Sequence, residues 1–185
     1  MKTKTLMLGL AAPLFWGTGL TLAKPAVTHF PPLFMMLLVY GGIALVMLVT
    51  VREKIQTPWK SIQLIAAFAV TIQGAFLFWG LRGVEATTAN LVLQTQVPMA
   101  VLLGWMMTGD ALNARKLIGM AVALVGVAIV IGLPEQRPPM FPVALIIVGA
   151  FFWALGQVFA QKLGKDSGVV LLKANAIASP PQLFI

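Results

Sequence analysis

Seven polar or aromatic side chains lie within long apolar stretches of the sequence, where hydrogen-bonding groups are costly and therefore candidates for function. Amides, a phenol and indoles can recognise a small molecule through hydrogen bonds and stacking. For each glutamine, the alternative role is a hydrogen bond between two helices. We predict that they line a substrate pocket: Trp16, Tyr40, Gln73, Gln94, Gln96, Trp153 and Gln157.

Catalytic and metal-binding chemistry has little support in the sequence. Cysteine is absent, which excludes thiolate metal sites and cysteine nucleophiles. The single histidine, His29, stands in a Pro-rich loop, and no Asp or Glu lies in the middle of an apolar stretch. An intramembrane enzyme would need a base, a nucleophile or a metal cluster. We therefore expect no enzyme activity, no metal and no cofactor.

Two prolines are expected to bend the helices that carry these groups. Pro13 and Pro98 lie inside apolar runs, and proline removes a backbone donor and kinks a helix. Pro98 is expected to leave the carbonyl of Gln94 without its intrahelical partner, next to the amide side chains of Gln94 and Gln96. Such a carbonyl would suit a polar pocket.

The elements that position these residues are hydrophobic helices. The chain has 185 residues, of which 59% are hydrophobic and 10% charged, whereas a soluble domain has about a quarter charged residues. Apolar runs near 20 residues match the hydrocarbon core of a bilayer. Six such runs are present: 5–23, 32–51, 62–81, 86–107, 117–133 and 141–161. The stretch 174–185, with Pro180 and Pro181, is too short to span and would begin a seventh helix.

The basic residues alternate between the two sides of this arrangement. Ten Lys or Arg residues fall on the side of the N-terminus and three on the other, namely Lys24, Arg82 and Arg137. The positive-inside rule places the ten in the cytoplasm, with an N-terminus inside. Membrane orientation also explains the net charge of +8, so we expect no nucleic-acid partner.

A weak internal repeat divides the chain. Phe15, Trp16, Gly19 and Ala23 recur 137 positions later as Phe152, Trp153, Gly156 and Ala160. A repeat unit of five helices has inverted topology, which many secondary transporters use around a central site. Small residues on these faces would allow close helix packing. We expect a first repeat over 1–133, a Pro-rich external linker over 134–140 and an incomplete second repeat over 141–185.

Several segments together resemble the EamA-type drug/metabolite transporters. They are the segment from Trp79 to Leu91, then Pro98, Gly109-Asp110, Gly119 and Gly126-Val127, with the starts of the two repeats at Phe15 and Phe152. The resemblance implies two inverted five-helix halves, and transport of small metabolites. Two positions depart from the family pattern: Asp110 stands where Glu is usual, and Val39-Tyr40 where many members carry Arg.

The expected protein is thus an all-α membrane bundle with about six to seven transmembrane helices, in a bacterial plasma (inner) membrane. Its expected function is export or uptake of small polar or amphipathic metabolites or drugs by alternating access. Its expected partners are the lipid bilayer, a small-molecule substrate, and either a second copy of the chain or a missing C-terminal half. The alternatives are a non-transporting fragment and, less favoured, an intramembrane enzyme.

Overall fold

The computed structural model describes the backbone of residues 3–109, 111–132 and 138–183, and the side chains of these residues outside 3–13 and 130–132. Within these ranges the secondary structure is helical. The helices are α1 Thr3–His29, α2 Pro32–Thr50, α3 Trp59–Ala66, η1 Ala67–Ile72, α4 Gln73–Gly83, α5 Ala86–Leu93, α6 Gln96–Thr108, α7 Ala114–Gly132, α8 Met140–Leu163 and α9 Gly168–Gln182.

Each of the six predicted apolar runs forms helix. In the described residues, four helical segments are long and apolar enough to cross a membrane: Pro32–Thr50, Trp59–Gly83, Ala86–Thr108 and Met140–Leu163. α1 and α7, with 27 and 19 residues, correspond to the remaining two runs. The chain is therefore an all-α membrane protein, as its composition predicts.

Two of these runs are not uniform α-helices. The third run contains η1, a π-helical segment of six residues between α3 and α4. π-Helices are rare and are often found at functional sites. The fourth run breaks between α5 and α6 at Gln94 and Thr95, four and three residues before Pro98. α6 then ends at Thr108, and the next residue, Gly109, has a φ of +74°, which glycine readily adopts.

The last helix differs from the sequence-based expectation. α9 has 15 residues and begins at Gly168, so Lys173 lies inside it instead of marking its beginning. The Lys173 ammonium donates to the backbone carbonyls of Val51, at 2.7 Å, and Glu53, at 3.3 Å. The lysine is tolerated in the helix because its charge reaches carbonyls at the end of α2.

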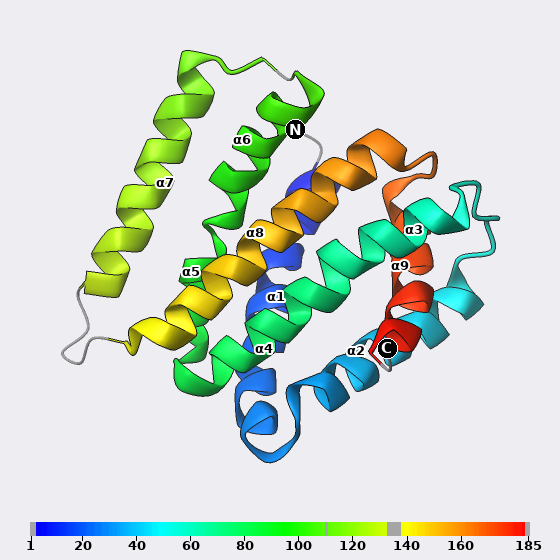
Figure 1. Ribbon diagram of the computed structural model, residues 1–185, viewed down its shortest axis with the longest axis horizontal. Helices are drawn as coiled ribbons and strands as arrows, with labels where there is room; N and C mark the ends of the chain where they lie inside the picture. The colour runs from blue at the N-terminus through cyan, green and yellow to red at the C-terminus, as the bar shows by residue number, and fades with distance from the viewer. Residues whose placement is uncertain (1–2, 110, 133–137, 184–185) are drawn as a thin grey trace.

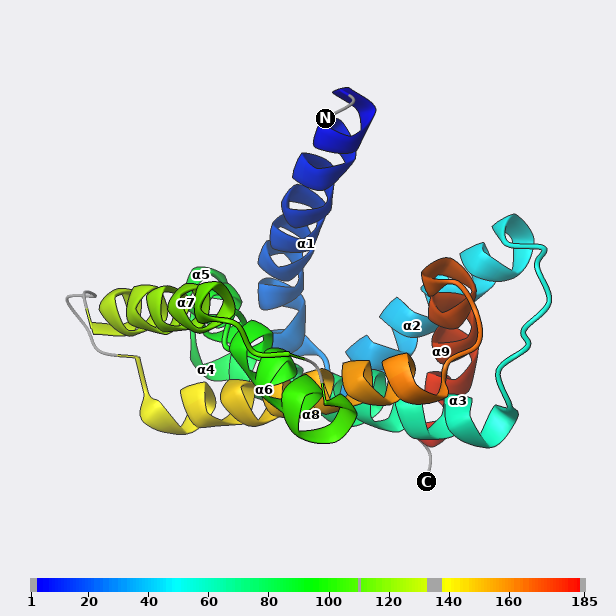
Figure 2. The ribbon, with the colours of Figure 1, turned by 90° about the horizontal axis from the view of Figure 1, so that it is seen from above.

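The helix α8 is the centre of the packing. Figure 1 shows α8 beside the continuous helix formed by α3, η1 and α4, with α5 and α6 on its other side. α9 lies between α2 and α3. The largest buried cluster joins α4 and α8 to the ends of α1 and α2 and to α5. In Figure 2, the N-terminal part of α1 rises away from the layer that contains α4 and α8.

Glycines of α8 allow this close packing. A Cβ at Gly156 would lie 2.5 Å from the Cβ and the backbone nitrogen of Ala69, and a Cβ at Gly149 would lie 3.1 Å from the carbonyl oxygen of Gln73. The small face predicted for the sixth run therefore meets η1 and α4 directly. The matching position in α1, Gly19, has nothing within 4 Å of such a Cβ. Close approach of a neighbouring helix is thus found at Gly156 in α8 and not at Gly19 in α1.

Two sets of hydrogen bonds tie together the loops at opposite ends of the bundle. At one end, Lys24 donates to the carbonyls of Leu81 and Arg82, and Arg82 donates to those of Val27 and Phe30. At the other end, the Asp166 carboxylate accepts the backbone N–H groups of Gln56 and Thr57, each at 2.9 Å.

These two groups of loops are the ones that the charge alternation places on opposite sides of the membrane. Lys24 and Arg82 come from the side with few basic residues, whereas the loop that Asp166 and Lys173 contact carries Arg52 and Lys54. The predicted linker over 134–140 falls mostly outside the described residues, as does Asp110.

Candidate functional site

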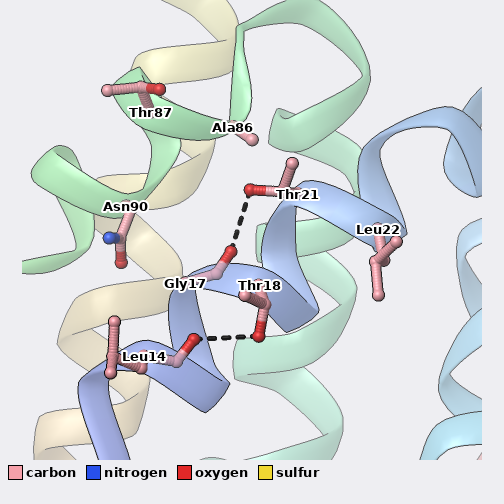
Figure 3. Close-up of a pocket in the computed structure, with 8 residues that line it drawn as sticks. All are labelled: Leu14, Gly17, Thr18, Thr21, Leu22, Ala86, Thr87 and Asn90. Atoms are coloured by element: carbon pink, nitrogen blue, oxygen red, sulfur yellow. Dashed lines mark hydrogen bonds between the residues drawn. The ribbon is translucent and has the colours of Figure 1, made fainter. Parts of the chain in front are cut away.

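A groove of about 490 Å³ lies between α1 and α5. Figure 3 shows the lining residues of α1 on one side of it and those of α5 on the other. A volume of this size is in the range of small-molecule sites. The lining residues are Leu14, Gly17, Thr18, Thr21, Leu22, Ala86, Thr87 and Asn90.

The groove combines an apolar wall with uncharged polar groups. The hydroxyl of Thr18 donates to the carbonyl of Leu14 at 2.8 Å, and that of Thr21 donates to the carbonyl of Gly17 at 2.9 Å (Figure 3). Because each hydroxyl has used its hydrogen within α1, it offers only oxygen lone pairs to the groove. The Asn90 amide adds both donors and an acceptor. The groove thus suits a small amphipathic molecule without a requirement for net charge.

The contacts that fix α1 against the start of α5 lie at one end of the groove. Lys24, one turn beyond Leu20 in α1, bonds to the last turn of α4. The Gly83–Glu85 turn that follows leads directly into α5, and Val84 in this turn is buried. Arg82, in the last turn of α4, also bonds to α1 by donating to the Val27 carbonyl at 2.8 Å. These hydrogen bonds hold the two walls in place through the connection between α4 and α5.

The seven predicted pocket residues do not line this groove, and they are spread over several helices. The Trp16 side chain is 51% exposed on α1, next to Gly17 of the groove. Gln94 and Gln157 are exposed, whereas Gln73 is buried, with 3% of its surface exposed. Gln96, Tyr40 and Trp153 are half-buried, and Tyr40 packs beside the cluster of Ile65, Ala69 and Val70.

The carbonyl of Gln94 is not free, contrary to the expectation drawn from Pro98. It accepts the backbone N–H of Val97 at 3.1 Å, in a tighter turn of the chain. The helix break between α5 and α6 therefore satisfies the group that proline would leave without a partner. The Pro13 side chain lies outside the described residues, and the backbone of α1 passes position 13 without a break.

The seven pocket residues predicted from the sequence do not include the four polar residues of the groove: Thr18, Thr21, Thr87 and Asn90. A usable signal was their spacing, because Thr18 and Thr21 are three residues apart in one helix, and Thr87 and Asn90 are three apart in another. Each pair shares a helix face.

No cluster of three or more His, Asp or Glu side chains that could hold a metal occurs in the described part of the chain. His29 is exposed, and its Nδ1 lies 2.9 Å from the carbonyl oxygen of Pro25 and 3.0 Å from the Thr28 hydroxyl. These are local contacts at the end of α1.

Comparison with known proteins identifies the family of the chain. Residues 3–132 match the EamA-like transporter family. The chain is 31% identical over 173 residues to a protein of Escherichia coli (strain K12) named "Probable amino-acid metabolite efflux pump", covering 90% of this chain and 56% of that protein. It is 28% identical over 174 residues to an uncharacterized transporter of Bacillus subtilis (strain 168), covering 88% and 55%.

The chain spans about half the length of the curated relatives that it matches. No solved structure matches it. The family match covers well over half of the chain, and the relatives named above are transporters or efflux pumps. The chain is therefore a multi-pass membrane protein that belongs to the EamA-like transporter family.

Proposed function

We propose that this chain takes part in the secondary transport of small, uncharged or zwitterionic amphipathic metabolites across a bacterial plasma membrane. The observation that carries this proposal is the groove between α1 and α5, which offers threonine and asparagine groups beside an apolar wall and no charged side chain. Amino-acid metabolites, which the name of the Escherichia coli relative mentions, fit this chemistry. Export is the direction that the name of the same relative favours.

The mechanism proposed is alternating access, in which two parts of the bundle rock about a binding site. The contacts of Lys24 and Arg82 hold the groove at one end of the bundle. The N-terminus is proposed to lie in the cytoplasm, because ten of the 13 basic residues then face inward. The Arg52–Lys54 loop is then cytoplasmic, and the turn after α1 is external.

The transport proposal is tested with the 185-residue chain in proteoliposomes. Vesicles preloaded with unlabelled neutral amino acids are diluted into the same radiolabelled amino acids, and counterflow is measured for each. Asn90→Leu is expected to lower the rate at least tenfold, because it removes the one amide side chain of the groove, which can donate and accept hydrogen bonds at the same time. Gln94→Leu, one turn along and exposed to lipid or solvent, serves as the control and is expected to stay within twofold of the parent chain.

The comparison of the two variants distinguishes a binding site in the groove from one at the predicted glutamines. A large loss with Gln94→Leu and none with Asn90→Leu would move the site to the glutamines. Absence of counterflow for every amphipathic amino acid, in a correctly inserted chain, would refute transport by this chain. Orientation is tested separately by labelling cysteines introduced at Gln56 and Thr28, since the chain has no cysteine of its own. Impermeant reagent outside intact cells is expected to reach position 28 only.

A further inference from the structure

The face of α9 that points into the bundle carries a row of polar side chains. Asn175, Ser179 and Gln182 are spaced four and three residues apart, so they share one face of the helix. Asn175 is 9% exposed and Ser179 is fully buried. The helix α9 packs against α2 and against the continuous helix that contains α3 and η1 (Figure 1). Polar groups buried in the membrane part of a protein often have a functional role.

One member of the row, Gln182, forms hydrogen bonds with residues in the first half of the chain. The Gln182 amide nitrogen donates to the backbone carbonyl of Gln63 at 2.9 Å and also contacts the side-chain oxygen of Gln63. The Gln182 amide oxygen accepts from the Thr71 hydroxyl at 2.6 Å. Thr71 lies in η1, the π-helical segment. The polar row therefore continues from α9 onto the irregular part of the neighbouring helix.

The other two members carry unused hydrogen-bonding capacity. The Asn175 amide oxygen and the Ser179 hydroxyl oxygen are buried, and neither has a hydrogen-bond partner among the described residues. Buried polar groups in native proteins are nearly always paired, so such groups call for an explanation. The neighbouring face of the same helix, with Ala174 and Ala178, instead packs on the apolar side chains of Ile62 and Ala66. The unpaired groups are thus confined to one stripe of α9.

The charges around this row limit what it can bind. Lys173, two residues before Asn175, has its ammonium on the carbonyls of Val51 and Glu53. The Asp166 carboxylate is occupied by the backbone N–H groups of Gln56 and Thr57. The row itself contains amides and hydroxyls and no ionised group. An amide oxygen can only accept a hydrogen bond, whereas a hydroxyl can donate or accept.

We propose that this row, defined by Gln63, Thr71, Asn175, Ser179 and Gln182 and called here the α9 seam, is a second binding site for neutral hydrogen-bond donors. The amide, hydroxyl or indole N–H of a small amphipathic molecule donates to the Asn175 oxygen and bonds to the Ser179 hydroxyl. The seam is closed in this structure, so a ligand reaches it when α9 moves away from α2 and α3. The inference rests on the proposed transport function and extends the substrate path beyond the groove.

The test compares two buried positions of α9 that differ only in the stripe they occupy. Ser179→Cys and Ala178→Cys are made in the 185-residue chain, inserted in proteoliposomes, and treated with a water-soluble methanethiosulfonate reagent. Both side chains are fully buried in the parent chain, and no native cysteine interferes. Modification at position 179 is expected to be at least tenfold faster than at 178. Equal rates at the two positions would overturn the proposal.

The chemical class of the ligand is tested by protection of the same cysteine. The probes are 4-methylpentanamide, a neutral N–H donor, and 4-methylpentanoate, an anion with the same apolar chain. The amide is expected to slow modification of Ser179→Cys severalfold, and the carboxylate is expected to leave it unchanged at the same concentration. Protection by both probes, or by neither, would overturn the assignment to neutral donors. Adding Asn175→Leu is expected to abolish protection by the amide.

These results can be separated from the proposed function. Labelling needs no transport, so a lack of counterflow together with fast, amide-protected labelling at 179 would refute the transport proposal alone. Counterflow that depends on Asn90, together with equal labelling at 178 and 179, would refute the seam alone. If Ser179→Cys does not reach the membrane, Asn175→Cys is labelled in its place, with the same expected contrast to Ala178→Cys.

Discussion

Replacement of Gly156 by alanine tests the close contact between α8 and η1. A Cβ at this position would lie 2.5 Å from the Cβ and backbone nitrogen of Ala69 and 2.7 Å from its Cα. The shortest of these distances is 0.9 Å below the 3.4 Å at which ordinary van der Waals contact begins. Because two of the three atoms belong to the backbone, no side-chain rotation relieves the clash, and the two helices must move apart.

The separation of α8 from η1 also disturbs the aromatic contacts beside it. The ring of Phe68 lies 5.8 Å from that of Phe152 and 5.5 Å from that of Phe159, measured between centroids. Overpacking of this kind costs about 1–3 kcal/mol, and alanine returns up to about 1 kcal/mol through its higher helix propensity. We therefore expect Gly156→Ala to lower the free energy of unfolding by up to about 2 kcal/mol.

The matched control is Gly126→Ala in α7, where a new Cβ meets nothing within 4 Å. This control should gain up to about 1 kcal/mol from helix propensity alone. Because both variants share that gain, they should differ by the overpacking cost, about 1–3 kcal/mol. The assay is reversible unfolding in mixed micelles with increasing SDS, followed by helical circular dichroism. Equal stability of the two variants would refute the packing of α8 against η1.

Two further predictions concern hydrogen bonds between distant parts of the chain. The Thr57 side chain and then the backbone N–H groups of the α2–α3 loop lower the pKa of Asp166 below its usual range. The folded pKa is thus depressed, so the contact is fully present above the unfolded pKa and is lost only as pH falls through the lowered value. The Thr57 amide should stay protected from hydrogen exchange, after correction for the intrinsic exchange rate, throughout the pH range in which carboxylates ordinarily titrate. The Asp166→Asn variant should lose that protection at every pH. Gln182→Leu removes hydrogen bonds to α3 and η1, each about 0.6 kcal/mol on average in a membrane protein, and should lower stability by about 1–2 kcal/mol. The exposed Gln157→Leu should be neutral in the same unfolding assay, and an equal loss there would contradict the assigned role of Gln182.

The positions of the long helices were predictable because bilayer thickness imposes a length on each apolar run. The run expected over 62–81 forms the helix Trp59–Gly83, and the run expected over 141–161 forms Met140–Leu163. The π-helical segment was not predictable, because a change of helix type leaves the apolar character of the run unchanged. The beginning of α9 was not predictable, because a lysine usually indicates the end of an apolar helix. Lys173 instead lies inside α9, and its ammonium donates to the Val51 carbonyl at the end of α2.

The groove was harder to predict from the sequence than the fold. Threonines in membrane helices usually bond back to their own backbone, as Thr18 and Thr21 do, so they look structural in a sequence. The glutamines were favoured because their side chains are large and costly to bury. Gln94 and Gln96 do not converge, because they are two residues apart at a helix break and therefore point in different directions. Tertiary packing determines which polar helix faces come together.

The contact between Asp166 and the α2–α3 loop has a consequence for the order of assembly. The N–H groups of Gln56 and Thr57 leave the ribosome about 110 residues before the carboxylate that binds them. These two N–H groups therefore lack this partner while the helices from α3 to α8 are synthesised. Since α4 and η1 likewise find their main packing partner in α8, we expect the early helices to complete their packing only after α8 has been inserted.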